Sequence, residues 1–303
     1  MTYKNKHKWS KSKFLATLNP DAKELFEIWI NSGGYSVKMT SYFSTYAELL
    51  SGYRNKECTL VEIGVLEGGS LSMWREWLGE KARIIGIDLN PAAKSLEKQG
   101  FEIFIGNQAD ADFWKNFYSK VDKIDILIDD GGHQSFQQIM TIYCGVCNLD
   151  SESLIIVEDT ATSFYSSMAH YHKKNSFLQF TKDATDILTV KEKEFSQQDW
   201  QNDVNETILK VFKNIESIRF FSGIVAYKIN PHSSLPPVAI NNCKSEKEYK
   251  EVLNNPEIAN DFRKMGNING IEIEWPNPFE KNVRKVEGES HNPKQKIMKI
   301  KLK

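Results

Sequence analysis

A glycine-rich turn between two apolar segments constrains the fold of this chain more than any other stretch. Residues 60–63 form a short apolar run around one acid, as expected for a buried parallel strand at about residues 58–63. Three glycines follow, at Gly64, Gly68 and Gly69. Glycine lets the backbone adopt positive φ and pass close to a ligand. Ser70 then begins an expected helix, and residues 84–88 form a second apolar strand. This order predicts a strand–turn–helix–strand unit with a ligand at the turn.

Two acids in this strand–turn–helix–strand unit indicate which kind of ligand it binds. Asp88 lies 24 residues after Gly64 (88 − 64), about where a nucleotide-binding unit places a carboxylate on ribose hydroxyls. The glycine spacing is not the G-x-G-x-x-G pattern of pyrophosphate binding. Glu62, inside the first strand, would favour the cationic sulfonium and ammonium of S-adenosylmethionine. The sequence therefore favours S-adenosylmethionine over NAD, with a turn in some other α/β protein as the alternative.

Length and charge exclude several classes of protein. The chain has 303 residues, 40% hydrophobic and 26% charged, with a formal net charge of −1. This composition is that of a globular protein with a sizeable core. The chain has no overall positive charge that would attract nucleic acid or an anionic membrane. It also has no apolar run of transmembrane length. We expect a cytoplasmic protein without nucleic-acid or membrane partners, and leave a homo-oligomer open. Cys144 and Cys147 are expected to be buried helix residues rather than a zinc or redox pair.

Apolar and helical stretches alternate regularly after the first unit. Further strands are expected at residues 101–105, 124–128 and 154–157. Such alternation predicts an α/β fold with a doubly wound, mostly parallel sheet. Two later apolar segments, residues 215–221 and 224–229, are joined by Ser222-Gly223 and predict a C-terminal antiparallel hairpin. The expected parts are a helical segment with a basic tail at 1–54, the α/β domain at 55–230 and a charged extension at 231–303.

Acidic residues gather where two of these strands end. The list is Asp129, Asp130, Glu158 and Asp159, with His133 three residues after Asp130. Ligands of open parallel sheets bind beyond the carboxyl ends of the strands. Carboxylates suit Mg²⁺, Mn²⁺ or Ca²⁺ better than zinc. A histidine beside them can act as a general base. The alternative is that these acids only cap turns and helix N-termini.

Several of these motifs together resemble a known family. They are Glu62-Ile-Gly64-Val-Leu-Glu-Gly68-Gly69-Ser70, Ile-Asp88, Gly106-Asn-Gln108-Ala-Asp110, Ile-Asp129-Asp130-Gly-Gly-His133 and Val-Glu158-Asp159. Over residues 55–230 the chain resembles the macrocin and mycinamicin sugar O-methyltransferases, which share motifs with cephalosporin hydroxylase-like proteins. The resemblance implies a Rossmann-like class I methyltransferase fold, S-adenosylmethionine and Mg²⁺.

The resemblance also implies roles for individual residues. Metal ligands would be Asp130, Glu158 and Asp159, with His133 as the base. The cofactor pocket would be formed by Glu62, Gly64, Gly69, Ser70, Asp88, Asn107, Gln108 and Asp129. Asn107 stands where many relatives have an acid.

The expected activity is methyl transfer from S-adenosylmethionine to a hydroxyl of a sugar or a sugar-containing natural product, assisted by Mg²⁺. Two other readings stay open at this point: an NAD-dependent oxidoreductase, and a binding protein that keeps the pocket without turnover. RNA methylation fits the basic tails but not the neutral net charge.

Overall fold

A computed structural model describes residues 10–165, 175–189, 212–231, 267–268, 271–273 and 300–302. The chain divides into two compact units, Met1–Pro236 and Pro237–Lys303. Most of the expected extension at 231–303 lies outside the described residues. The expected part boundaries after residues 54 and 230 stay predictions.

The first unit is built on a seven-stranded sheet of order β3-β2-β1-β4-β5-β7-β6. Its strands are β1 (Cys58–Ile63), β2 (Ala82–Asp88), β3 (Glu102–Ile105), β4 (Ile126–Asp129), β5 (Leu154–Val157), β6 (Ile215–Phe220) and β7 (Val225–Ile229). The first five strands pair in parallel, and β7 runs antiparallel to both β5 and β6. The expected doubly wound sheet with a C-terminal antiparallel hairpin is confirmed.

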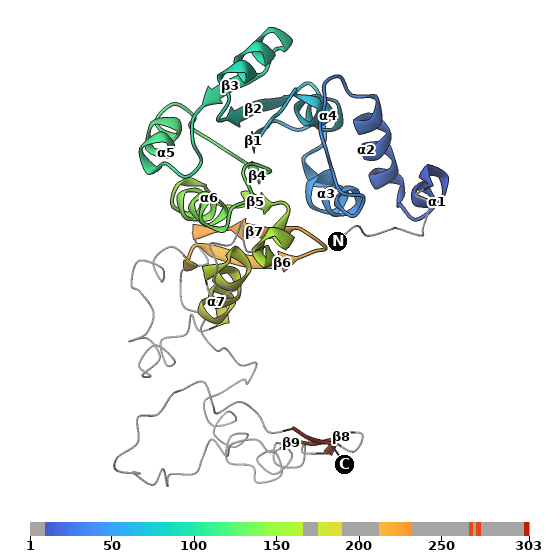
Figure 1. Ribbon diagram of the computed structural model, residues 1–303, viewed down its shortest axis with the longest axis vertical. Helices are drawn as coiled ribbons and strands as arrows, with labels where there is room; N and C mark the ends of the chain where they lie inside the picture. The colour runs from blue at the N-terminus through green and yellow to red at the C-terminus, as the bar shows by residue number, and fades with distance from the viewer. Residues whose placement is uncertain are drawn as a thin grey trace, which may run out of the picture. The chain divides into compact units, whose positions relative to one another are not determined.

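Helices cover both faces of the sheet (Figure 1). On one side lie α1 (Lys11–Leu15), α2 (Pro20–Asn31), α3 (Tyr42–Leu50) and α4 (Gly69–Leu78), and on the other α5 (Ala111–Tyr118), α6 (Ser135–Asn148) and α7 (Phe177–Thr189). Short 3₁₀ helices are η1 (Ser51–Tyr53), η2 (Pro91–Gln99) and η3 (Thr160–Phe164). Alternate strand residues enter the two separate cores, so each face is apolar. Cys144 and Cys147 both lie in α6, as expected, but the expectation that both are buried is wrong, because Cys144 is half-buried and Cys147 is exposed.

The N-terminal helices share a core with the sheet. Leu25 of α2 and Tyr46 of α3 are fully buried in the same cluster as Leu60 of β1 and Trp74 of α4. The Tyr46 and Trp74 rings meet edge to face, with centroids 5.0 Å apart. The helices therefore fix the position of the segment that connects α2 to α3.

That connecting segment, residues 34–39, is named the strap here. It crosses the glycine turn between β1 and α4. A Cβ on Gly34 would lie 2.2 Å from the Glu67 carbonyl oxygen, and a Cβ on Gly69 would lie 2.7 Å from the Gly34 carbonyl oxygen. The Tyr35 amide donates to the Glu67 carboxylate at 3.2 Å, and the Trp29 indole donates to the Ser36 hydroxyl at 2.8 Å. The strap is thus held against the turn at close backbone distance.

The second unit contains the strands β8 (Asn267–Ile268), β9 (Ile271–Ile273) and β10 (Ile300–Leu302), which pair antiparallel in the order β10-β9-β8. Across the part of the chain that the structure describes, no helix is long and apolar enough to cross a membrane.

The strap offers a matched pair of glycine substitutions. Gly34 has φ +84° and no space for a Cβ, whereas a Cβ on Gly33 meets nothing within 4 Å. We expect Gly34→Ala to lower the free energy of unfolding by at least ~1 kcal/mol, since both the left-handed backbone and the contact penalise a side chain. Gly33→Ala should leave it unchanged within ~1 kcal/mol. Urea unfolding followed by tryptophan fluorescence measures both, and equal losses would contradict the packing of the strap.

Candidate functional site

A cavity of about 480 Å³ opens at the carboxyl ends of the central strands. Its wall combines the ends of β1, β2, β4 and β5, the loop after β3, and the strap. The lining residues are Val37, Met39, Tyr42, Ile63, Gly64, Leu66, Asp88, Leu89, Gly106, Asn107, Gln108, Asp130, Gly131, Gly132, His133, Gln137, Glu158 and Asp159. The cavity lies where open α/β sheets bind ligands.

The turn after β1 passes directly over the loop after β4. Gly64 has φ +82°, and a Cβ there would lie 2.2 Å from the Asp130 carbonyl oxygen. The Asp88 carboxylate accepts bonds from the Val65 amide at 3.0 Å and the Asn90 amide at 2.7 Å. Asp88 therefore braces the turn while also lining the cavity. Gly64 and Asp88 both line the cavity, and their role in cofactor binding stays a prediction.

Gln108 and Asp129 hold the loop after β4 in shape. The Gln108 amide nitrogen donates to both Asp129 carboxylate oxygens, at 2.9 and 3.0 Å, and its oxygen accepts from the Gly132 amide at 3.0 Å. Asp129 is fully buried, and this burial raises the pKa of its carboxyl group. Asp129 is not part of the cavity wall, whereas Gln108 and Asn107 are. Asp129 thus acts on the cavity through the loop that it supports.

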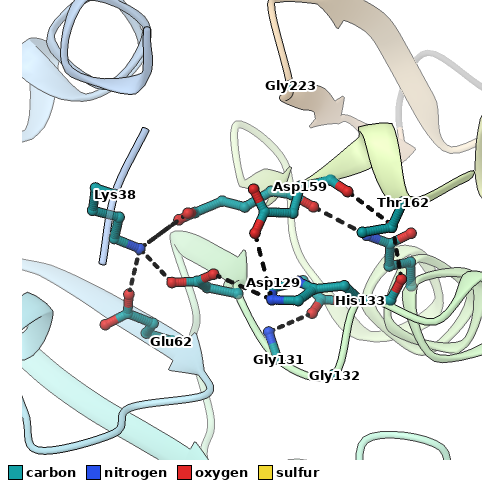
Figure 2. Close-up of polar contacts among 12 residues, drawn as sticks. Lys38, Glu62, Asp129, Gly131, Gly132, His133, Asp159, Thr162 and Gly223 are labelled. Carbon is teal, nitrogen blue, oxygen red and sulfur yellow. Dashed lines mark hydrogen bonds and ion pairs between the residues drawn. The ribbon is translucent and has the colours of Figure 1, made fainter. Parts of the chain in front are cut away.

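Three side chains form an outer group on the cavity wall: Asp130, His133 and Asp159. One potential ligand atom from each lies within 4.8 Å of the others. His133 Nε2 is 3.5 Å from Asp159 Oδ2 and 4.0 Å from Asp130 Oδ1 (Figure 2). His133 Nδ1 is buried and has no hydrogen-bond partner among the described residues. The group can bind a cation or accept a proton.

Two of the three residues in the outer group have a strained backbone. His133 and Asp159 have φ values of +54° and +52°, in the left-handed region that non-glycine residues rarely occupy. The His133 carbonyl accepts from the Thr162 hydroxyl at 2.9 Å, and the Asp159 carboxylate accepts from the Tyr42 hydroxyl at 2.5 Å. Such strain persists where surrounding contacts enforce it, and it is concentrated at functional sites.

A second, inner group lies behind the first and contains a lysine. Lys38 Nζ donates to Asp130 Oδ2 at 2.6 Å, to Glu158 at 2.8 and 3.1 Å, and to Glu62 Oε1 at 3.3 Å (Figure 2). Glu158 also accepts a short hydrogen bond from the Tyr46 hydroxyl. Lys38 reaches this position from the strap. The inner group therefore joins the N-terminal segment to the ends of β1, β4 and β5.

Burial and charge act in opposite directions on the inner group. Burial alone would lower the pKa of Lys38, but Glu158 and the other acidic neighbours outweigh it and hold this pKa well above its usual range. Burial raises the pKa of Glu62, and burial together with Asp130 raises that of Glu158. Lys38 is accordingly an ammonium ion at neutral pH. Its charge is tolerated in this buried position because the acids surround it.

The structure brings most of the predicted residues to the cavity wall, but some of them lie behind the wall and do not line the cavity. Glu62 is fully buried and does not line the cavity; its carboxylate accepts from Ser70 at 2.7 Å and from Lys38. Gly69 packs against the strap rather than on the cavity. The sequence did not single out Lys38, Tyr42 or Tyr46. No local pattern marks Lys38, since its partners Glu62, Asp130 and Glu158 lie 24, 92 and 120 residues further along the chain.

The side-chain amide of Gln108 is expected to stabilise the loop after β4. We expect Gln108→Leu to lower the free energy of unfolding by about 1–3 kcal/mol, because it leaves the buried Asp129 carboxylate and the Gly132 amide without their partner. The same change at the exposed Gln99 should alter it by less than ~0.5 kcal/mol. Urea unfolding measures both variants. A loss at Gln108 no larger than at Gln99 would show that the loop does not depend on this amide.

Comparison with known proteins supports the fold and the resemblance. No family model matches the chain. It is 27% identical over 132 residues to the 8-demethyl-8-alpha-L-rhamnosyl tetracenomycin-C 2'-O-methyltransferase of Streptomyces olivaceus, which covers 41% of this chain and 34% of the relative. It is 27% identical over 120 residues to the demethylmacrocin O-methyltransferase of Streptomyces fradiae, covering 37% of this chain and 30% of the relative. The aligned part is thus about a third of each relative.

Among solved structures, the MycE methyltransferase of mycinamycin biosynthesis, in complex with Mg and SAH, superposes with a TM-score of 0.60 and 19% identity. The match covers 78% of this chain and 60% of MycE. At this identity the likeness shows the fold. The expected class I methyltransferase fold is therefore confirmed, and the predicted resemblance to the macrocin and mycinamicin sugar O-methyltransferases is confirmed over the segment that aligns.

Proposed function

We propose that this protein is a Mg²⁺-dependent O-methyltransferase that transfers a methyl group from S-adenosylmethionine to a hydroxyl of a sugar or a sugar-containing natural product. The observation that carries the proposal is the outer group: two carboxylates and a histidine on the wall of a cavity at the ends of parallel strands. The sugar O-methyltransferases that align with the chain, and the Mg and SAH held by MycE, support it.

The cavity suits the cofactor. Its volume of about 480 Å³ lies in the range of small-molecule sites. Asp88 lines it at the end of β2, where a carboxylate can accept bonds from ribose hydroxyls. Leu66 and Leu89 line it as well, and both are exposed, so they offer apolar surface at the opening. S-adenosylmethionine combines a ribose with apolar and cationic parts, and this mixed wall matches it.

The outer group suits Mg²⁺. Asp130 and Asp159 supply hard carboxylate oxygens, the ligands that Mg²⁺ prefers, and both line the cavity. Glu158 completes the ligand set that the resemblance implies, although its carboxylate is held here by Lys38 and Tyr46. A metal ion held by these residues supplies positive charge that lowers the pKa of a neighbouring hydroxyl.

His133 is placed to receive the proton of the acceptor hydroxyl. As its ring takes the proton, the acceptor oxygen forms a bond to the methyl carbon and the carbon–sulfur bond breaks, which leaves a neutral thioether. Asp159 Oδ2, at 3.5 Å from Nε2, stabilises the imidazolium that results. The Thr162 hydroxyl donates to the His133 carbonyl oxygen and helps to hold the positive φ of this residue, so the protein contributes mainly the position of the base.

Removing the base tests the catalytic role of His133. Asparagine tolerates the left-handed backbone of this residue, so His133→Asn should keep the loop intact. We expect turnover to fall by about 10²–10⁴-fold, the usual contribution of a general base. The affinity for S-adenosylhomocysteine, measured by calorimetry, should stay within about threefold. The assay follows S-adenosylhomocysteine release with glycosylated acceptors such as mycinamicin VI. Turnover within tenfold of the unmodified protein would refute the assignment.

Calorimetry tests the cofactor and the metal directly. S-adenosylmethionine titrated into the protein should bind with a dissociation constant in the micromolar range. Mg²⁺ should bind to the unmodified protein and not to Asp130→Ala, because Asp130 belongs to both carboxylate groups. Turnover that is indifferent to EDTA would remove the metal from the mechanism. Absence of S-adenosylmethionine binding, with NADH binding in its place, would overturn the proposed function.

A further inference from the structure

The Tyr42 hydroxyl contacts Asp159 at two points. It donates to Asp159 Oδ1 at 2.5 Å and accepts from the Asp159 backbone amide at 3.1 Å. A tyrosine hydroxyl keeps its proton at neutral pH, whereas a carboxylate offers only acceptors, so the direction of the first bond is determined. The Gly223 carbonyl lies 3.3 Å from the same hydroxyl, but it already accepts from the Thr160 amide at 3.1 Å. The single hydroxyl proton therefore belongs to the nearer Asp159 oxygen.

Tyr42 is itself held in place by two parts of the fold. It is the first residue of α3, it is buried, and its ring meets that of Tyr46 edge to face with centroids 6.0 Å apart. The turn between β6 and β7 also packs against it, because a Cβ on Gly223 would lie 2.9 Å from the Tyr42 hydroxyl. Next to it, the Ser41 hydroxyl donates to the Ser222 carbonyl at 3.1 Å. The position of the hydroxyl thus depends on α3 and the hairpin, and not on Asp159.

Asp159, in contrast, is only partly enclosed. Its side chain is 39% exposed, and its φ of +52° is one that non-glycine residues rarely adopt. In the part of the chain that the structure describes, Tyr42 is the residue that donates a hydrogen bond to its carboxylate. The other oxygen, Oδ2, lies 3.5 Å from His133 Nε2 (Figure 2). Tyr42 therefore occupies Oδ1 and leaves Oδ2 beside His133.

We propose that Tyr42 is a positioning residue for the metal site, whose hydroxyl holds Asp159 by its carboxylate and its backbone amide together and so keeps Oδ2 available to the metal ion. The inference rests on the proposed function, in which Asp130, Glu158 and Asp159 are the metal ligands. It adds a residue from the N-terminal helices that supports one of these ligands.

Ordering of the ligand gives the reason. A carboxylate that rotates freely loses this freedom when it binds a metal ion, and the loss weakens binding. A carboxylate that is already held in the metal-free protein binds without that loss. Removal of the hydrogen-bond partner behind a metal ligand typically lowers metal affinity by about 10–100-fold. We expect a loss of this size at Asp159, because Tyr42 holds both its side chain and its backbone.

A Mn²⁺ titration of the full chain tests the proposal. Mn²⁺ prefers the same oxygen ligands as Mg²⁺, and free Mn²⁺ is measured by its electron paramagnetic resonance signal. Tyr42→Phe keeps the ring and removes only the hydroxyl. We expect this variant to bind Mn²⁺ with a dissociation constant about 10–100-fold higher than that of the unmodified protein. An unchanged dissociation constant in the folded variant would overturn the proposal.

Tyr227→Phe is the matched control. Tyr227 is fully buried, its hydroxyl forms a hydrogen bond with Thr181 at 2.5 Å, and it does not line the cavity. This variant should bind Mn²⁺ with the affinity of the unmodified protein. An equal loss of affinity in Tyr227→Phe and Tyr42→Phe would show that any lost hydroxyl in the core weakens the site, and the proposal would be wrong.

A double-mutant cycle shows whether Tyr42 acts through Asp159. Asp159→Gly removes the carboxylate, and glycine tolerates the positive φ at this position. We expect Asp159→Gly to weaken Mn²⁺ binding, and Tyr42→Phe to weaken it no further in that background, because the two residues act as one unit. A further loss as large as the one in the unmodified background would show that Tyr42 acts by another route, and would refute the positioning role.

The same titration separates this inference from the proposed function. If the unmodified protein binds no Mn²⁺, the metal site of the proposed function is refuted, and the role of Tyr42 with it. If the unmodified protein binds Mn²⁺ and Tyr42→Phe binds it equally well, only the role of Tyr42 is refuted. Should Tyr42→Phe not fold, Tyr42→Met, which also lacks a hydroxyl, takes its place in each comparison.

Discussion

The contact between the Lys38 ammonium and the buried acids is the interaction on which the candidate site depends. It connects the strap to the ends of β1, β4 and β5 at distances of 2.6–3.3 Å. Acids buried in this way are unfavourable without a partner, and removal of one member of such a cluster is strongly destabilising. The lysine thus compensates the buried negative charge, and its bond to Asp130 Oδ2 leaves Oδ1 on the side of His133.

A second network supports the loop after β4 from the other side. Gln108 and Asp129 hold the backbone at Gly131 and Gly132. The turn at Gly64 lies on the same loop, where no side chain fits. Buried polar groups that are fully paired make a local structure rigid. Asp130 and His133 therefore extend from a backbone that is fixed from two directions, and the strained φ of His133 is maintained by that support.

Much of this arrangement could be predicted from the sequence. The strand bounds at Cys58–Ile63 and Leu154–Val157 follow from short apolar runs, and the order of strands and helices predicted the parallel sheet. Asp88, Asp130, His133 and Asp159 were placed correctly at one edge, because parallel strands bring their carboxyl ends together. Their assigned roles as cofactor, metal and base residues stay predictions. Pattern reasoning placed Glu62 and Asp129 on the pocket too, whereas both side chains are buried behind its wall.

The sequence alone determined the class of fold and the edge at which the chemistry is expected, because both depend on local periodicity and on strand ends. Only the tertiary structure decided how the acids are divided between two groups. That division depends on Lys38, which is 24 residues from Glu62 and 120 from Glu158 in the chain. A contact over such separations has no local pattern, since it arises only after α2 and α3 pack against α4 and bring the strap over the turn.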